Sequence, residues 1–302
     1  MITYVKRKDL DLEKYNTCIE KSNQSKVFAF SWYLDIVAEN WSVLVYKDYN
    51  AVMPLPWKKK FFIKYIYPPF WLLELGVFSL DDKFDIQLFF KALFSKFKFV
   101  ETRLNSKNKL NISRKYLKDG QMQVLKLEDD YTSILSNFRK DRKKDLQRAF
   151  KNDLTEKWND NPNYLITLFK NNVGKRTSNI IDKDYDSLQK LISTCIKKRV
   201  GEVLSIYDKN NNIVASGFFL KHKKEVTILV SSTDFKNRKN GANTFLIDRA
   251  IYKYQKNFKV FNFGGSSINS VAKYFSSFNA VTLIYQHLKI NNLPFLLKIF
   301  KR

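Results

Sequence analysis

One short polar segment combines residue types that bind phosphate groups. Arg238, Lys239, Asn240 and Gly241 follow an apolar run over 226–230 that predicts a buried strand, and they precede apolar residues at helical spacing. The first turn of a helix carries unpaired N–H groups and the positive end of the helix dipole, so anions bind there. A glycine lets the backbone approach a ligand closely. These residues are compatible with an anion site, but their spacing alone slightly favours an ordinary surface loop that enters an amphipathic helix.

The full loop, Arg238-Lys239-Asn240-Gly241-Ala242-Asn243, resembles the acyl-CoA pyrophosphate loop of the GNAT acyltransferase superfamily, Arg/Gln-x-x-Gly-x-Gly/Ala. It departs from that pattern at Asn243. With the strand end Ser231-Ser232 before it and Phe263-Gly264-Gly265-Ser266 after it, the longer segment is similar to the FemAB branch. The resemblance is best over residues 210–295. FemAB proteins have two GNAT-like lobes and transfer aminoacyl groups from tRNA to peptidoglycan precursors.

The resemblance implies how the donor is held and activated. The donor would be acetyl-CoA or another acyl-CoA, with aminoacyl-tRNA as the alternative, and the acceptor would carry an amine. Residues 238–243 would bind the donor phosphates, and the backbone of Ser231 and Ser232 would polarise the acyl carbonyl. The chain has two histidines, His222 and His287, so metal-independent chemistry is expected.

The acid and the base of this reaction are less clearly marked. GNAT proteins place a tyrosine four residues before a glycine, where this chain has Phe275 and Asn279. Tyr274 is adjacent but rotated by about 100° around the helix, so it would serve if the register shifted. Tyr285 is a second candidate acid, or a buried structural tyrosine. Glu202 is the candidate base, and as a strand-end glutamate it also fits a solvated position.

The acceptor groove is expected to involve both halves of the chain. Segments of the first half, such as Ser31-Trp32-Tyr33-Leu34-Asp35, look like a group of bacterial GNAT-type proteins, which implies that the first lobe is the degenerate one. The role of the first lobe would be to shape the groove. The groove residues implied are Trp57, Trp71, Gly264, Gly265 and Ser266. For Trp57 and Trp71, core packing is the alternative.

The elements around these residues predict an α/β (α+β) fold with two GNAT-like lobes, each a mixed, mostly antiparallel sheet flanked by helices. The expected domains are 1–128 for the first lobe, 129–199 for a basic helical connector and 200–302 for the second lobe. Residues 130–151 are expected to form one helix, whose seven basic residues could contact phosphates or form a solvated face with Asp141 and Asp145 pairing locally.

Composition restricts the class of partner. The net charge is +25, and residues 200–302 carry +11 of it, which favours polyanions such as CoA, tRNA or acidic phospholipid. The N-terminus contains no apolar signal segment, and Cys18 and Cys195 are too few for a disulfide framework, so a cytoplasmic protein is expected. The tail over 295–302 could touch an anionic membrane surface or dock on the protein.

Two functions follow from these observations. The first is an acyltransferase or aminoacyltransferase of GNAT or FemAB type, favoured by the loop through Gly241 and by the Gly264-Gly265 turn. The second is a non-catalytic relative that binds nucleic acid or another polyanion through its basic surface. Phe275 favours the second, as does Asn262, because FemAB proteins often have an aspartate at that position and asparagine cannot take up a proton.

Overall fold

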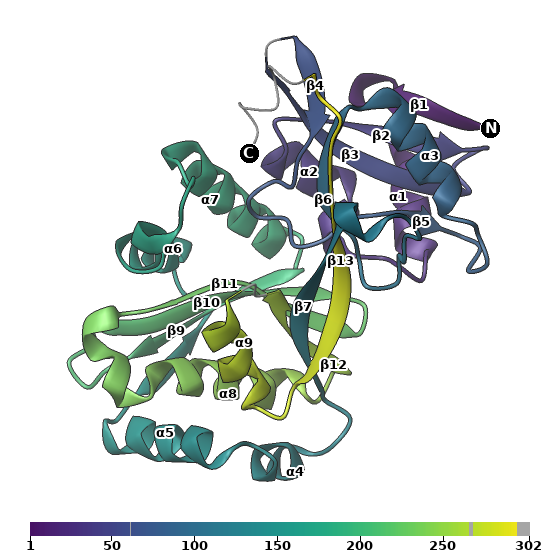
Figure 1. Cartoon of the computed structure of the whole chain (residues 1–302). Helices are drawn as coiled ribbons and strands as arrows, with labels where there is room; N and C mark the ends of the chain where they lie inside the picture. Colours follow the sequence, from purple (N-terminus) through teal and green to yellow (C-terminus); the bar gives the residue numbers. More distant parts are fainter. Residues whose placement is uncertain (61, 266–267, 295–302) are drawn as a thin grey trace. The chain divides into compact units, whose positions relative to one another are not determined.

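The computed structural model describes residues 1–60, 62–265 and 268–294, without the side chains of Asn237 and Arg238. The chain divides into two compact units (Figure 1). The first unit comprises Met1–Gly120 and the described residues from Ile284 onward, and the second comprises Gln121–Leu283. In this division the expected connector over 129–199 is part of the second unit. The chain passes from one unit to the other twice, within β7 (Leu117–Lys126) and within β13 (Val281–Asn291).

The first unit is a mixed sheet with strand order β1-β2-β3-β4-β6-β13, and β5 lies beside β3. Only β4 and β6 pair in parallel among the described strands of this unit. Apolar residues of β2, β3, α3 and β13 form its core. Its elements are β1 (Ile2–Lys6), η1 (Arg7–Asp9), α1 (Leu12–Lys21), η2 (Val27–Ala29), α2 (Ser31–Val37), β2 (Asn40–Tyr46), β3 (Ala51–Lys60), β4 (Ile63–Ile66), β5 (Phe78–Ser79), α3 (Gln87–Lys96), β6 (Phe99–Arg103) and η3 (Arg114–Tyr116).

The second unit is a sheet with strand order β7-β12-β11-β10-β9-β8, in which β11 and β12 are parallel. The apolar face predicted for α8, which includes Ile247, Ala250, Ile251 and Tyr254, is buried in its core. Its further elements are α4 (Tyr131–Ser136), α5 (Lys140–Lys151), β8 (Thr155–Trp158), α6 (Pro162–Asn171), η4 (Gly174–Arg176), α7 (Asp182–Lys197), β9 (Gly201–Tyr207), β10 (Ile213–His222), β11 (Glu225–Thr233), η5 (Phe235–Asn240), α8 (Ala242–Tyr254), β12 (Val260–Gly265) and α9 (Asn269–Ser276).

These sheets and helices confirm the expected α/β (α+β) fold class, with one element-level correction. The single helix expected over 130–151 is wrong, because α4 ends at Ser136 and α5 begins at Lys140. The break includes Phe138, which is buried and whose ring centre lies 5.0 Å from that of Phe278. Packing of this side chain has therefore overridden the continuous helical pattern.

Two further expectations concern membranes. The tail over 295–302 lies outside the described residues. Within the described chain, no helix has both the length and the apolar character needed to cross a bilayer.

Candidate functional site

The candidate site lies in the second unit, where two neighbouring strands stop pairing. β11 and β12 pair between residues 225–227 and 260–262, and β12 then forms a bulge against β7 between Asn262 and Gly265. Gly264 has φ +76° in this bulge, a left-handed conformation that favours glycine. Its N–H donates to Oδ1 of Asn262 at 2.8 Å. Asn262 therefore acts as a support of the bulge, and the end of β11 extends beyond the paired region.

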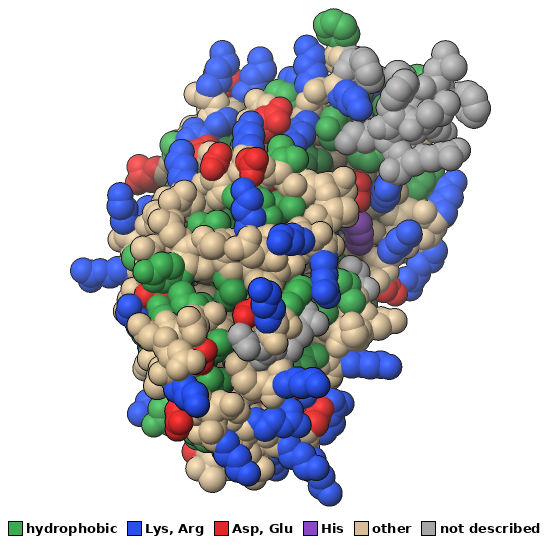
Figure 2. Space-filling view, turned by 90° about the vertical axis from the view of Figure 1, so that its left-hand side faces the viewer, with side chains coloured by type: hydrophobic (Ala, Val, Ile, Leu, Met, Phe, Trp, Pro, Cys, Tyr) green, Lys and Arg blue, Asp and Glu red, His purple; other side chains and the backbone are tan. Residues whose placement is uncertain are grey.

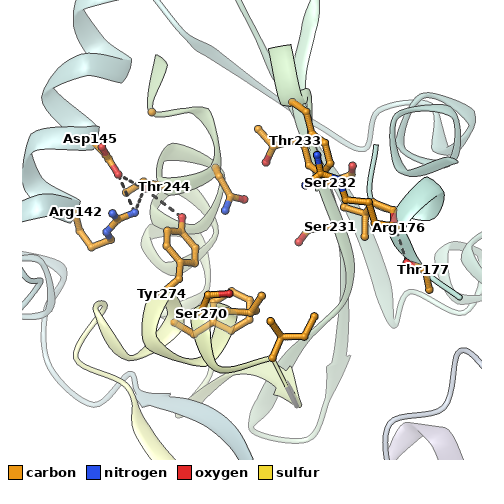
Figure 3. Close-up of a pocket in the computed structure, with 17 residues that line it drawn as sticks. Arg142, Asp145, Arg176, Thr177, Ser231, Ser232, Thr233, Thr244, Ser270 and Tyr274 are labelled. Carbon is orange, nitrogen blue, oxygen red and sulfur yellow. Dashed lines mark hydrogen bonds and ion pairs between the residues drawn. The ribbon is translucent and has the colours of Figure 1, made fainter. Parts of the chain in front are cut away.

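A cavity of about 720 Å³ lies at this end of β11 (Figure 3). Its wall is built by β11, the start of α8, α9, α5 and the segment around η4. Several lining residues are polar or belong to the motifs predicted from the sequence. They are Arg142, Asp145, Arg176, Ser231, Ser232, Gly241, Asn243, Thr244, Tyr274 and Phe275.

Gly241 is required by the packing of the protein itself. It has φ +85° and lies between η5 and α8. A Cβ atom at this position would be 2.1 Å from the backbone oxygen of Asp145 and 3.2 Å from the backbone nitrogen of Ala149, both in α5. The close approach that needs a glycine is thus made by α5, whereas the sequence suggested an approach by a ligand.

The other residues of the predicted phosphate loop have different surroundings. Asn243 lines the cavity, and Ala242 is buried in the core. Lys239 is exposed, and Oδ1 of Asn240 accepts a hydrogen bond from the N–H of Ala242 at 2.9 Å. The side chain of Arg238 lies outside the described part. The loop therefore brings the N-terminus of α8 to the cavity, with Gly241 and Asn243 in its wall.

Tyr274 extends from α9 into the cavity and ends in a polar cluster (Figure 3). Its hydroxyl lies 3.2 Å from Oγ1 of Thr244. Thr244 in turn donates to Oδ2 of Asp145 at 3.1 Å and accepts from Nη1 of Arg142 at 2.8 Å. The Arg142 guanidinium lies 4.6 Å from the centre of the Tyr274 ring. Three helices, α5, α8 and α9, thus fix the position of one phenol group.

The surroundings of Tyr274 keep its hydroxyl protonated. Burial raises the pKa of Tyr274 to about 12, against the opposing effects of the Thr244 hydrogen bond and the Arg142 charge. The phenol is therefore neutral at physiological pH and able to donate a proton. Phe275 also lines the cavity, with its ring 5.0 Å from that of Phe263. Tyr274 thus reaches the cavity in the existing register of α9.

The second candidate acid, Tyr285, has different surroundings. It belongs to the first unit and is 9% exposed. Its ring lies so close to Gly120 that a Cβ atom there would be 2.2 Å from the phenol carbon Cζ. Tyr285 is not among the residues that line the 720 Å³ cavity of the second unit. Its position is that of a packed structural tyrosine.

Glu202 lies in a different cavity, of about 340 Å³, with its carboxylate held by three donors. Lys221 and Lys253 contact it at 2.7 and 2.9 Å, and the Tyr254 hydroxyl donates to it at 2.8 Å. Burial alone would raise the pKa of Glu202, but these hydrogen bonds and charges lower it to about 2. A carboxylate held in this way accepts a proton poorly at neutral pH.

Arg176 provides a positive charge on another wall of the cavity. Its guanidinium lies 4.2 Å from the centre of the Phe235 ring, which orients it. Among the described residues, no carboxylate lies within ion-pair distance of Arg176, in contrast to Arg142, which contacts both Asp141 and Asp145. Arg176 is therefore available to an anionic ligand.

The residues expected in the acceptor groove are dispersed. Trp71 is 5% exposed in the first unit, and its backbone oxygen accepts from the Tyr33 hydroxyl. Trp57 is half-buried, with Nε1 donating to Ser42 at 3.1 Å. Gly264 is buried in the β12 bulge and Gly265 is exposed, while Ser266 lies outside the described residues. Both tryptophans thus have packing partners, which was the alternative interpretation.

Sequence reasoning did not identify the roles of Arg142, Asp145, Thr244 and Arg176. Arg142 and Asp145 are three residues apart in a basic helix, a spacing that also fits a surface ion pair. Nothing local marks Thr244, because its partners lie about a hundred positions earlier in the chain. Arg176 lies in η4, where it is exposed and no local pattern distinguishes it from the other basic residues of the chain.

Comparison with known proteins establishes the fold but not the reaction. No protein-family model matches this sequence, and no curated protein sequence matches it. The structure is similar to that of FemX, with a TM-score of 0.65 at 9% identity over 97% of this chain and 99% of that one.

Two further solved structures have a similar fold. The C-terminal domain of a putative lysylphosphatidylglycerol synthetase from Agrobacterium fabrum gives a TM-score of 0.57 at 12% identity, over 93% of this chain and 91% of that one. A tandem GNAT protein from the clavulanic acid biosynthesis pathway gives a TM-score of 0.55 at 7% identity, over 97% of this chain and 99% of that one. The chain therefore has the FemAB-like fold of two GNAT-like units, as its sequence motifs predicted.

Proposed function

We propose that the second unit transfers an acyl or aminoacyl group from a phosphate-bearing donor to an amine. The observation that carries this proposal is the position of the Tyr274 hydroxyl, which lies 3.2 Å from Oγ1 of Thr244 in a cavity at the end of β11. An acid placed beside an uncovered strand end is what acyl transfer requires, because the leaving group needs a proton while the carbonyl needs a hydrogen-bond donor.

In the proposed reaction the amine nitrogen attacks the acyl carbonyl carbon of the donor. The backbone at Ser231 and Ser232 stabilises the negative charge that develops on the carbonyl oxygen. A new C–N bond forms while the C–S bond of a thioester, or the C–O bond of an aminoacyl ester, breaks. Tyr274 gives its proton to the departing sulfur or oxygen. The proton lost by the amine passes to solvent, after which Tyr274 takes up a proton again.

The donor is expected to carry phosphate. The uncompensated charge of Arg176 and the N-terminus of α8 at Asn243 both favour an anion in the cavity. An acyl-CoA and an aminoacyl-tRNA share this chemistry. The names of the structural neighbours include both a tandem GNAT protein and FemX, so both donor classes enter the test.

The test is a transfer assay with acetyl-CoA, a long-chain acyl-CoA and aminoacyl-tRNA as donors and a panel of amines as acceptors. Tyr274→Phe removes the acid and leaves the ring, so turnover is expected to fall by about 10²–10⁴-fold while the donor still raises the melting temperature. The matched control is Tyr164→Phe, since Tyr164 is 47% exposed on α6 and outside the cavity. Unchanged turnover in Tyr274→Phe would contradict the proposed role.

A second function, polyanion binding without catalysis, is favoured by the charge of the chain. Many Lys and Arg side chains and fewer acidic ones are visible on the face in Figure 2. In that case tRNA would raise the melting temperature at low salt, and Arg176→Gln would not change this rise. No acyl-CoA or aminoacyl-tRNA would be consumed. Donor binding through the cavity would instead be weakened by Arg176→Gln at every salt concentration.

A further inference from the structure

The hairpin of β3 and β4 in the first unit combines strong positive charge with an exposed aromatic side chain. The two strands pair antiparallel from Trp57 opposite Ile66 to Lys60 opposite Ile63. Residues 57–67 contain four lysines and no acidic residue. The hairpin is therefore a local concentration of charge, in contrast to the mixed charges of α5.

Phe62, at the turn, is 91% exposed. It also has φ +65°, a left-handed conformation that is unusual for a bulky residue. Within the described protein this ring contacts the Lys59 ammonium, and most of its surface faces solvent. The tight turn accounts for this backbone conformation, which other turn residues such as Tyr49 share, and the exposed ring beside a cluster of lysines is the feature that a partner would bury.

The lysines lie directly behind this tip. Lys60 is opposite Ile63 in the strand pair that ends at the turn, and Lys59 is opposite Lys64 one residue further along the strands. The backbone of these three lysines therefore lies within about 3–7 Å of the turn. The ammonium of Lys59 lies 5.2 Å from the centre of the Phe62 ring, and that of Lys64 lies 4.3 Å from the Trp57 ring. Behind them, Lys58 lies 4.6 Å from the Tyr67 ring.

From the turn inward, the order is apolar side chain, lysines, then tryptophan and tyrosine. A bilayer surface presents an acyl boundary and, above it, a headgroup layer that contains the phosphate groups and in which Trp and Tyr rings are also favoured. Phe62 is the projecting aromatic side chain among the described residues of the turn, and a single side chain offers far less than the about 800 Å² that each partner contributes to a stable protein interface. The charges match anionic headgroups.

We propose that the β3–β4 hairpin docks this protein on an anionic phospholipid bilayer, with Phe62 entering the boundary between headgroups and acyl chains and Lys59, Lys60 and Lys64 among the lipid phosphates. This contact does not depend on the proposed acyl transfer. It differs from the expected contact through the tail over 295–302, because every residue that carries it belongs to the described hairpin.

The first experiment measures binding of the full chain to vesicles by flotation. Vesicles of phosphatidylcholine mixed with phosphatidylglycerol are expected to bind the protein, and vesicles of phosphatidylcholine alone are not. Phe62→Asn, which suits the left-handed backbone, is expected to weaken binding roughly tenfold or more. Lys59→Gln and Lys60→Gln are each expected to weaken it about fivefold at low salt. The matched control is Phe150→Asn, because Phe150 is 58% exposed on α5 of the second unit.

A second experiment locates the contact. Cys18 and Cys195 are buried, and burial raises the pKa of each thiol to about 12, so neither competes for a thiol-directed probe. A polarity-sensitive fluorophore on Phe62→Cys is expected to report an apolar environment on addition of the mixed vesicles, and the same probe on Phe150→Cys is not.

Three outcomes would overturn the proposal. The first is binding to mixed vesicles that Phe62→Asn leaves unchanged, since the contact would then lie elsewhere on the basic surface. The second is the absence of vesicle binding by the native chain. The third is binding of tRNA, in place of vesicles, that Phe62→Asn abolishes, which would make the hairpin a nucleic-acid contact.

Discussion

At the scale of single residues, Glu202 has the clearest measurable consequence. Its lowered pKa of about 2 implies that the folded state stabilises the carboxylate form. Relative to an unfolded value of about 4.5, the shift corresponds to about 3 kcal/mol. Because the folded-state pKa is the lower one, this stabilisation is fully present above about pH 4.5 and is lost as pH falls toward about 2.

We therefore expect Glu202→Gln to lower the free energy of unfolding by about 3 kcal/mol at pH 7. The difference between the variant and the native protein should shrink through the range from about pH 4.5 to 2, because both then have a neutral side chain there. Urea unfolding across this pH range measures it. The comparison variant is Glu128→Gln, because Glu128 is exposed. Its difference from the native protein in unfolding free energy is expected not to change with pH. A constant difference at all pH values would contradict the ion-pair explanation.

At the scale of elements, the junction of η5 and α8 is held against α5 by Gly241. Gly241→Ala would strain a left-handed backbone and place a Cβ atom 2.1 Å from the Asp145 carbonyl oxygen. We expect a loss of about 2–4 kcal/mol in unfolding free energy. Gly217→Ala in β10 is the control, because its Cβ would contact side-chain atoms at 3.3 Å, and a smaller loss is expected. Equal losses would contradict this account.

This packing also decides how variants of the loop should be interpreted. A bulky residue at Gly241 would displace α5, and with it Arg142 and Asp145, so that lost donor binding would not show contact between the glycine and the donor. Asn243 and Arg176 line the cavity without such a constraint, and they are the better probes of the donor.

How far the sequence predicts these elements depends on the range of the interactions. The apolar spacing of α8 and the order of strand, loop and helix around Gly241 are local patterns, and both occur in the structure. The break between α4 and α5 was missed because Phe138 continues the apolar stripe and its partner Phe278 is distant in sequence. Tyr274 was ambiguous because helical spacing does not say which side of α9 meets a cavity.

At the scale of the whole molecule, the dominant property is the net charge of +25. Repulsion among like charges destabilises a compact chain, and salt screens it over about 10 Å at 0.1 M. We expect the melting temperature to rise with sodium chloride between low and physiological ionic strength. Sodium sulfate at equal ionic strength separates screening from anion binding. A melting temperature independent of salt would indicate that local pairs, such as those of Asp141 and Asp145, already balance the repulsion.

The two crossings of the chain between units also set an order of events during synthesis on the ribosome. The first 120 residues emerge early, yet the core of their unit includes Leu288 and Ile290 of β13, and β6 pairs with β13 from Phe99 to Arg103. Until β13 has been made, that edge of β6 has unpaired backbone groups and its core lacks two side chains. The unit that begins first is therefore completed last, after all of the second unit has left the ribosome.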